Sequence, residues 1–372
     1  MYIKKCNYGL LRVLGIICIC IMHYRKLLVG DVLVGMGQRG FNLIADYGSA
    51  MVPFFFMLSG YCIALKYVRC KVEDKLLFFI RKRVYVLVPA ALFSTLIMAC
   101  LQWIYFFLHN QQWWTGREAT LYNVLGNFLG LQSIIPRQFM DTVNGPTWYI
   151  YSLLVCYLCF WMVYQLHSRH KVKLSLLWIL VFVLSAGAMI YNVELVFINS
   201  TNGRALMGFA MGCISAYETV DRHRAWIYEK VLAGMCIVVL GLCILSRLRI
   251  IGNVEFVLCF SFYPLVINSV RLIQDRYWFD KLDFLSIHLR NVSLFIYLYN
   301  LPSLILMSII NDGLKLDIRF ERIETLLFVM GINFAVGELG YWISQCPYFR
   351  RLKDQFIINC EKLLNYEEGV RS

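Results

Sequence analysis

The feature that most constrains this chain is a series of apolar windows, most of them about 20 residues long, with short charged segments between them. A helix of that length crosses the hydrocarbon core of a bilayer, which is about 30 Å thick. Hydrophobic residues make up 60% of the 372 residues, more apolar surface than a soluble domain of this size can bury. We therefore predict an all-α polytopic membrane protein of about ten transmembrane helices, with no soluble domain. The windows are 8–28, 47–67, 84–108, 146–166, 174–193, 203–217, 229–246, 252–271, 290–310 and 323–344.

The positions of Lys and Arg predict the orientation of these helices, because cytoplasmic loops carry an excess of both residues. With the N-terminus in the cytoplasm, 25 of the 36 Lys and Arg residues fall on the cytoplasmic side, and the C-terminus is cytoplasmic too. We divide the chain into a membrane domain at 1–345 and a basic amphipathic tail at 346–372. The net charge of +13 lies in short clusters between spans, so we expect membrane lipid rather than nucleic acid as a partner.

Two ionisable residues lie in the first window, with only apolar residues between them: Arg12 and His23. Eleven steps of about 100° bring both side chains to one stripe of a helix, roughly 16 Å apart along its axis. Ionisable groups inside a span are costly and commonly functional. The spacing predicts a tunnel that crosses much of the membrane. Because Arg12 interrupts this long window, we also expect it to remain as a span rather than to be a cleaved signal peptide.

The two residues suit different chemical tasks. An imidazole titrates near neutrality, so a neutral His23 can take a proton from a hydroxyl that attacks an activated carbonyl. Arg12 is permanently charged and suits a phosphate at the cytoplasmic mouth of the tunnel. The plainer interpretation of His23 is a histidine at the water interface, and the presence of Arg12 on the same stripe favours the functional one.

A basic cluster, Arg81–Lys82–Arg83, precedes the third window. It anchors the cytoplasmic side of the helix and also suits the entry of an anionic donor. Ser59–Gly60 in the second window permits close helix packing, and no neighbouring base suggests a nucleophilic Ser59. The Cys156–x–x–Cys159 pair has no second pair or nearby histidine, so we expect it to pack rather than bind metal.

Other polar residues are ambiguous. Those within or at the start of spans either line the same cavity or pair with one another as structural contacts, with Arg204 the best candidate for the cavity; they are Arg204, Asn268, Asn333 and Glu338. Trp148 is either a belt aromatic or a stacking partner for a sugar ring. The longest outer segment, 109–145, is a candidate wall of an acceptor site; its notable residues are Trp113, Trp114, Arg117, Glu118, Arg137 and Asp141.

Taken together and in this order, several of these motifs resemble the acyltransferase-3 family of integral-membrane acyltransferases. The resemblance covers essentially the whole chain, and the set in register is more specific than any one motif. The motifs are Arg12-x10-His23, Phe55-Phe56-x-x-Ser59-Gly60-Tyr61, the basic cluster before Pro89, Gly145-Pro146-Thr147-Trp148-Tyr149, and Ser293 followed by Tyr297-Leu298-Tyr299-Asn300-x-Pro302.

The resemblance implies a ten-span enzyme of the bacterial cytoplasmic membrane. It would transfer an acyl group, most often acetyl, from cytosolic acetyl-CoA or another acyl-CoA to a hydroxyl of an extracytoplasmic or lipid-linked glycan. Arg12 and His23 match the essential pair of the family, and Arg81 to Arg83 its cytoplasmic donor contact. His23 would act as general base or as an acyl-carrying relay. No bound cofactor or metal is expected. Further candidates for the cavity or the acceptor site are Ser59, Trp148, Arg204, Tyr297 and Asn300.

The chain departs from the family pattern at two positions. A second arginine usually stands three residues before the proline, where this chain has Val86. The ninth span often ends in a histidine, where this chain has Asn300. Two rival functions remain open at this point: a transporter or flippase for a lipid-linked sugar, and a membrane glycan polymerase. The chain shows neither the repeat symmetry typical of transporters nor an arginine-rich outer loop typical of polymerases.

Overall fold

The computed structural model describes residues 8–28, 33–69, 75–135, 140, 142–219, 222–245, 258–273, 283–351 and 354–355. These residues form helices and two isolated β-bridges, with no strand among them. Arg137, Asp141, the start of the predicted eighth span and most of the predicted tail lie outside the described residues. The principal helices are α1 (Gly9–Tyr24), α2 (Gln38–Tyr47), α3 (Met51–Arg69), α4 (Leu76–Leu108), α5 (Leu121–Phe128), α6 (Thr147–His170), α7 (Leu174–Ile190), α8 (Ser200–Glu218), α9 (Arg222–Leu245), α11 (Tyr263–Ile273), α13 (Asp283–Leu314) and α14 (Ile323–Gln345).

The all-α prediction is confirmed, and a helix lies at each of the predicted windows. Five helical segments among the described residues are long and apolar enough to cross a membrane. The first is Gln38–Val68, which joins α2 to α3, and the others lie in α4, α6, α13 and α14. α7 is apolar but shorter, at 17 residues. The chain is therefore an all-α protein with membrane-spanning helices, and the full number of spans stays a prediction.

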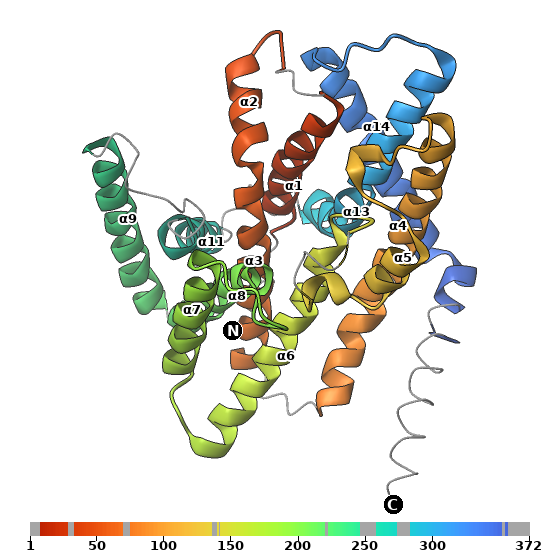
Figure 1. Ribbon diagram of the computed structural model, residues 1–372. Coiled ribbons are helices and arrows are strands. Elements are labelled where there is room, and N and C mark those ends of the chain that lie inside the picture. The colour runs from red at the N-terminus through yellow and green to blue at the C-terminus, as the bar shows by residue number, and fades with distance from the viewer. Residues whose placement is uncertain are drawn as a thin grey trace, which may run out of the picture.

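Three helices begin earlier than their predicted windows. α4 begins at Leu76 rather than at 84, α9 at Arg222 rather than at 229, and α13 at Asp283 rather than at 290. In each case the added segment contains charged or polar residues, such as Arg81–Lys82–Arg83 in α4, so a hydropathy window leaves it out although the helix continues. At 33 residues α4 is about 50 Å long, so it extends beyond the hydrocarbon core at its charged end. α2, which is amphipathic rather than apolar, was not predicted, and it leads through a short 3-10 turn into α3 (Figure 1).

The closest helix packing joins α3 to α8, and glycine makes it possible. A Cβ atom at Gly60 would lie 2.2 Å from the carbonyl oxygen of Phe209, and one at Gly212 would lie 2.0 Å from that of Met57. Backbone atoms of the two helices therefore touch at positions where no side chain fits, as is common between membrane helices. This confirms the packing role expected of Ser59–Gly60 in the second window, and its partner is Phe209 in the sixth window.

A proline in α13 leaves one backbone carbonyl free, and a hydrogen bond to that carbonyl joins α13 to the segment before α6. Pro302 has no N–H, so it leaves the carbonyl of Leu298, four residues earlier, without its helical partner. The side-chain amide of Asn144 donates to that carbonyl at 3.2 Å, and also to the hydroxyl of Ser94 in α4 at 3.2 Å. The Gly145–Tyr149 motif at the start of α6 and the Tyr297–Pro302 motif of α13 are thereby held side by side.

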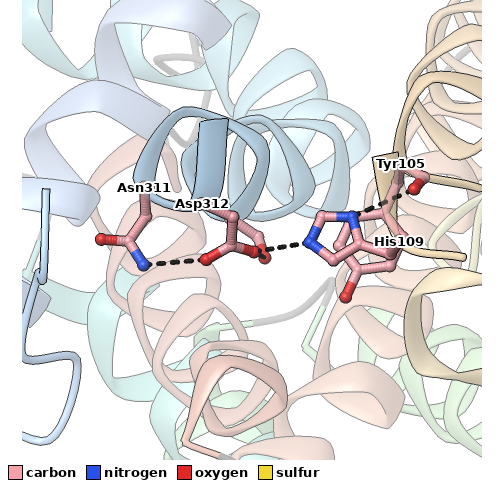
Figure 2. A network of polar contacts seen from close by, with 5 residues as sticks. Tyr105, His109, Asn311 and Asp312 are labelled. Atoms are coloured by element: carbon pink, nitrogen blue, oxygen red, sulfur yellow. Dashed lines mark hydrogen bonds and ion pairs between the residues drawn. The ribbon is translucent and has the colours of Figure 1, made fainter. Parts of the chain in front are cut away.

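Helices α4 and α13 end next to each other, at what we call the outer end of the molecule, which holds Leu108 and Leu314; we call the opposite end the inner end (Figure 1). His109 Nε2 lies 2.8 Å from a carboxylate oxygen of Asp312, and its ring stacks on Tyr105 (Figure 2). α1 also reaches the outer end, where the Tyr24 hydroxyl donates to the carbonyl of Phe320 at 2.8 Å. α1 packs against both α13 and α3, so its residues line the middle of the helix bundle.

Candidate active site

One face of α1 borders a cavity of about 710 Å³ in the inner half of the molecule. Arg12, Ile16 and Ile19 line it, and their spacing of four and three residues places them on one helical stripe. The next residue of that stripe is His23, one turn beyond the end of the lining. The cavity therefore follows about 10 Å of the roughly 16 Å between Arg12 and His23. The lining stops at Ile19, so the cavity accompanies the inner part of the stripe, and a tunnel that joins Arg12 to His23 stays a prediction.

The charge of this cavity is entirely positive. Its described lining contains cations from five different parts of the chain and no Asp or Glu. Cations that share a cavity with apolar and aromatic side chains create a positive electrostatic potential there, and this potential attracts an anion. The cations are Arg12 in α1, Lys66 in α3, Arg83 in α4, Arg290 in α13 and Arg350 after α14.

Arg12 and Arg83 are the half-buried cations of this set, and Arg12 is the one that lies on the α1 stripe. Its side chain is half-buried and makes no hydrogen bond with any residue that the structure describes, and its Nε is fully buried. It lies within electrostatic reach of the Tyr149 and Tyr157 hydroxyls in α6. A buried guanidinium without a carboxylate or carbonyl partner is costly to desolvate, so this arrangement is ready to bind an anionic ligand.

The three residues of the predicted basic cluster point in different directions from α4, and only one of them lines the cavity. Arg83 lies in the cavity lining, with its guanidinium carbon 3.8 Å from the ring centre of Phe79. Arg81 and Lys82 are exposed and lie outside that lining, and the ammonium of Lys82 sits 3.7 Å above the ring of Phe78. Of the three residues, only Arg83 has the position of a direct contact to a ligand in the cavity.

His23 is held by a hydrogen bond that crosses from α1 to α13. Its Nδ1 lies 2.9 Å from Oδ1 of Asn300. A carbonyl oxygen only accepts hydrogen bonds, so Nδ1 carries the proton and the neutral ring has its lone pair on Nε2. Nε2 makes no hydrogen bond with any described residue. The half-buried imidazole is therefore fixed in one tautomer, with its basic nitrogen available to a substrate.

The position where the family often has a histidine thus holds the residue that orients His23. A second layer of polar groups supports this region. The Asn333 amide donates to the Cys20 sulfur at 3.1 Å, and the Ser303 hydroxyl donates to the Asn333 carbonyl oxygen at 3.3 Å. These contacts tie α14 to α1 and α13 near the imidazole, so Asn333 has the structural role that was one of its two predicted alternatives.

Some of the remaining predicted candidates line the cavity, and others contact neighbouring segments outside it. Ser59 and Tyr297 line the cavity, and Tyr297 packs edge-on against Tyr149 with 5.5 Å between ring centres. Trp148 packs on Phe56 and lies outside the lining. Arg204, the favoured cavity candidate, instead donates to the carbonyl of Ser49 and also lies outside.

The two other ambiguous polar residues have partners outside the cavity. Asn268 donates to the carbonyl of Ala225 at 3.1 Å. Glu338 lies 2.7 Å from Nε2 of His288, a histidine that the sequence analysis did not single out. Both are structural contacts between neighbouring helices.

Sequence reasoning missed three of the five cations in the cavity. Lys66 lies seven residues after Ser59, and Arg290 lies seven residues before Tyr297, so each shares a helical stripe with a residue that was predicted. That periodicity is a signal that was present in the sequence. Arg350 follows α14 and its position depends on tertiary packing, in which Phe349 meets Phe93 of α4 with 5.7 Å between ring centres.

Cys156 and Cys159 are free thiols inside α6. Among the described residues, no group of three or more His, Cys, Asp or Glu side chains is arranged to hold a metal ion.

A family model described as an acyltransferase domain matches residues 7–341, which is nearly the whole chain. No curated protein and no solved structure matches it. The match begins before Arg12 and ends at Tyr341, so it contains the stripe and every described cavity residue except Ser344, Gln345 and Arg350. The chain belongs to the acyltransferase-3 family of membrane acyltransferases.

Proposed function

We propose that this protein transfers an acyl group, most simply acetyl, from cytosolic acyl-CoA to a hydroxyl of an extracytoplasmic or lipid-linked glycan. The observation that carries the proposal is the arrangement along one stripe of α1. A cavity lined by cations and by no described carboxylate begins at Arg12 and ends one turn before an imidazole with an available Nε2. Family membership supports acyl transfer, and this arrangement supports the choice of donor and base.

The cavity suits the donor in charge and in length. The nucleotide end of acyl-CoA carries several phosphate charges, and Arg12, Arg83 and Arg290 offer guanidinium groups for charge-assisted hydrogen bonds. An extended pantetheine arm is comparable in length to the roughly 16 Å between Arg12 and His23. With its phosphates at the inner end, the donor presents its thioester toward His23, and the side chains near Ile19 have to move to let it pass.

In the proposed reaction, Nε2 of His23 removes the proton of the acceptor hydroxyl while that oxygen attacks the thioester carbonyl carbon. The new C–O bond forms, the C–S bond breaks, and the electron pair leaves with the sulfur of CoA. The imidazolium then returns its proton to the thiolate. Asn300 holds the ring so that Nε2 faces the reacting oxygen.

A relay through acyl-His23 is a variant that uses the same nitrogen as nucleophile. The hydrogen bond to Asn300 serves both routes, because both require the lone pair on Nε2. Rapid quenching with radiolabelled acetyl-CoA in the absence of acceptor distinguishes them. Label that stays on the protein and disappears in His23→Ala indicates the relay.

We further propose ten spans with both termini cytoplasmic in a bacterial cytoplasmic membrane. Residues 1–345 then form the catalytic membrane domain, and 346–372 form a basic cytoplasmic tail. The cations of the cavity support this orientation, because it places the donor site on the cytosolic side. A sugar flippase or a glycan polymerase has no evident use for an available imidazole at the end of a cationic cavity.

Two experiments test the proposal. Purified protein in detergent should release free CoA from acetyl-CoA faster when glycan from cells that lack the protein is added, and His23→Ala should abolish this release. Mass spectrometry of surface glycans should show a difference of one acyl group between cells with and without the protein. Equal release by the wild type and His23→Ala, with no mass difference, would contradict the proposed function.

A further inference from the structure

A lysine lies one turn beyond His23, on the side away from the cavity. α1 continues at Tyr24 into a 3-10 turn, Arg25–Leu27, so Lys26 follows His23 by three residues and lies on a neighbouring part of the same face. The Lys26 side chain is half-buried. The donor cavity stops at Ile19, so Lys26 lies where a substrate that approaches from the outer end would meet His23.

Lys26 makes no hydrogen bond and no ion pair with any residue that the structure describes. Its neighbour Arg25, by contrast, pairs with the carboxylate of Asp46 in α2. An ammonium that is partly removed from water without a carboxylate partner lowers the stability of the fold unless a ligand compensates for it. The ligand that compensates for a cation is an anion.

A second cation shares this place. Arg117, from the segment between α4 and α5, is close enough for its charge to act on both Lys26 and His23. Its Nη1 donates to the carbonyl of Thr142 at 3.3 Å and lies 3.2 Å from where a Cβ of Gly145 would stand. Gly145 follows Asn144, which is fixed to α13, so Arg117 is held against the same helix that orients His23.

Three segments thus bring Lys26, Arg117 and His23 together at the outer end of the stripe. Lys26 is the group that needs a partner, and the positive charge of Arg117 nearby adds to the attraction for an anion that binds Lys26. The donor phosphates belong to the opposite end, beside Arg12 and Arg83. The anion at the outer end is therefore part of the other substrate.

We infer that Lys26 and Arg117 bind a carboxylate or phosphate of the acceptor and so present its hydroxyl to His23. This inference rests on the proposed function and narrows it: the acceptor is an anionic glycan. A uronic-acid carboxylate and the pyrophosphate of a lipid-linked oligosaccharide offer the same chemistry, and the experiment below distinguishes them.

The test uses the full-length protein with acetyl-CoA and two matched pairs of acceptors prepared from one glycan of cells that lack the protein. In the first pair, the polymer is compared with the same polymer after its carboxylates have been reduced to alcohols. In the second pair, the lipid-linked oligosaccharide is compared with the oligosaccharide freed from its pyrophosphate. We expect kcat/KM to be about tenfold to a hundredfold higher for the anionic member of one pair, and that pair identifies the source of the charge.

Lys26→Met should remove most of this preference through a higher KM for the anionic acceptor, while Lys26→Arg should keep it. Lys315→Met, at an exposed lysine after α13, is the matched control and should behave as the wild type.

Two results would overturn the inference: a wild-type enzyme that does not distinguish the members of either pair, or a Lys26→Met variant that loses activity equally with neutral and anionic acceptors. The wild-type comparison decides the matter even where the variant fails to fold. Release of CoA that depends on His23 but shows no preference for an anionic acceptor would reject this inference alone. Release that does not depend on His23 would reject the proposed function.

Discussion

Arg12 and His23 lie at the two ends of the α1 stripe, and their surroundings differ in hydrogen bonds and in access to the cavity. At the inner end, Arg12 makes no hydrogen bond to a described residue and opens into a cavity with four other cations. At the outer end, His23 is oriented by Asn300 and lies beyond the cavity. The inner end has the charges that suit the phosphates of the donor, and the outer end holds the imidazole in one tautomer. Donor binding and proton transfer are thus separated along one helix, so substitutions of Arg12 and of His23 should change different kinetic constants.

The largest expected effect is that of His23→Ala. Loss of a general base typically slows a reaction by about 100- to 10,000-fold. We expect CoA release with acceptor to fall by that factor, while the Kd for acetyl-CoA, measured by calorimetry, stays within about twofold because the phosphates bind at the other end. A parallel loss of donor binding would show that the two ends are not separate.

For Arg12→Met we expect the opposite result: weaker binding of acetyl-CoA with little change in the rate of the chemical step. Removing a charge-assisted contact should raise KM for acetyl-CoA by about 10- to 100-fold, with a smaller change in kcat. Arg12→Lys keeps the charge but loses the planar fork, so we expect an intermediate KM. Initial rates at varied acetyl-CoA check both. A pure kcat effect in Arg12→Met would contradict the assignment of this residue to donor binding.

Asn300 tests whether the outer end works through orientation. Asn300→Leu removes the acceptor for Nδ1–H, and we expect kcat to fall by about tenfold to a hundredfold while acetyl-CoA binding is kept. Asn300→Asp restores an acceptor oxygen and should recover most of the rate. Equal damage by Leu and Asp, with donor binding intact, would show that Asn300 does not act through the imidazole.

The smallest expected effect concerns the exposed cations of the inner end. Arg290→Met and Arg350→Met should each raise KM for acetyl-CoA by about twofold to fivefold, because charges exposed to solvent contribute little individually. Arg81→Met, at an exposed arginine outside the cavity lining, is the control and should leave KM unchanged. A stronger effect of Arg81 than of Arg290 would place the donor along the outside of α4 rather than in the cavity.

Much of the fold could be predicted from hydropathy, because a span in lipid has to be apolar over its length. The same reasoning failed where charged or polar residues interrupt the early part of α4 and of α13, and at the amphipathic α2, because the helix there continues outside the apolar segment. Helical periodicity placed Arg12 and His23 on one stripe, and it would also have found Lys66 and Arg290.

Contacts between distant segments could not be predicted from one sequence. The hydrogen bond from His23 to Asn300 joins residues 277 positions apart, and the placement of Arg350 depends on how Phe349 meets α4. Arg204 shows the same difficulty: an arginine near the start of a span suggested a cavity residue, and the structure places its guanidinium on the carbonyl of Ser49, outside the described lining. Composition shows that such a group needs a partner, but only the packing of the helices shows which one.

The position of bound donor tests the central claim most directly. A cryo-EM structure with a non-transferable acetyl-CoA analogue should place the phosphates among Arg12, Arg83 and Arg290 and the acyl carbonyl near Nε2 of His23, with the side chains around Ile19 moved aside. An analogue bound with its acyl group away from His23, or outside the cavity that begins at Arg12, would contradict the account.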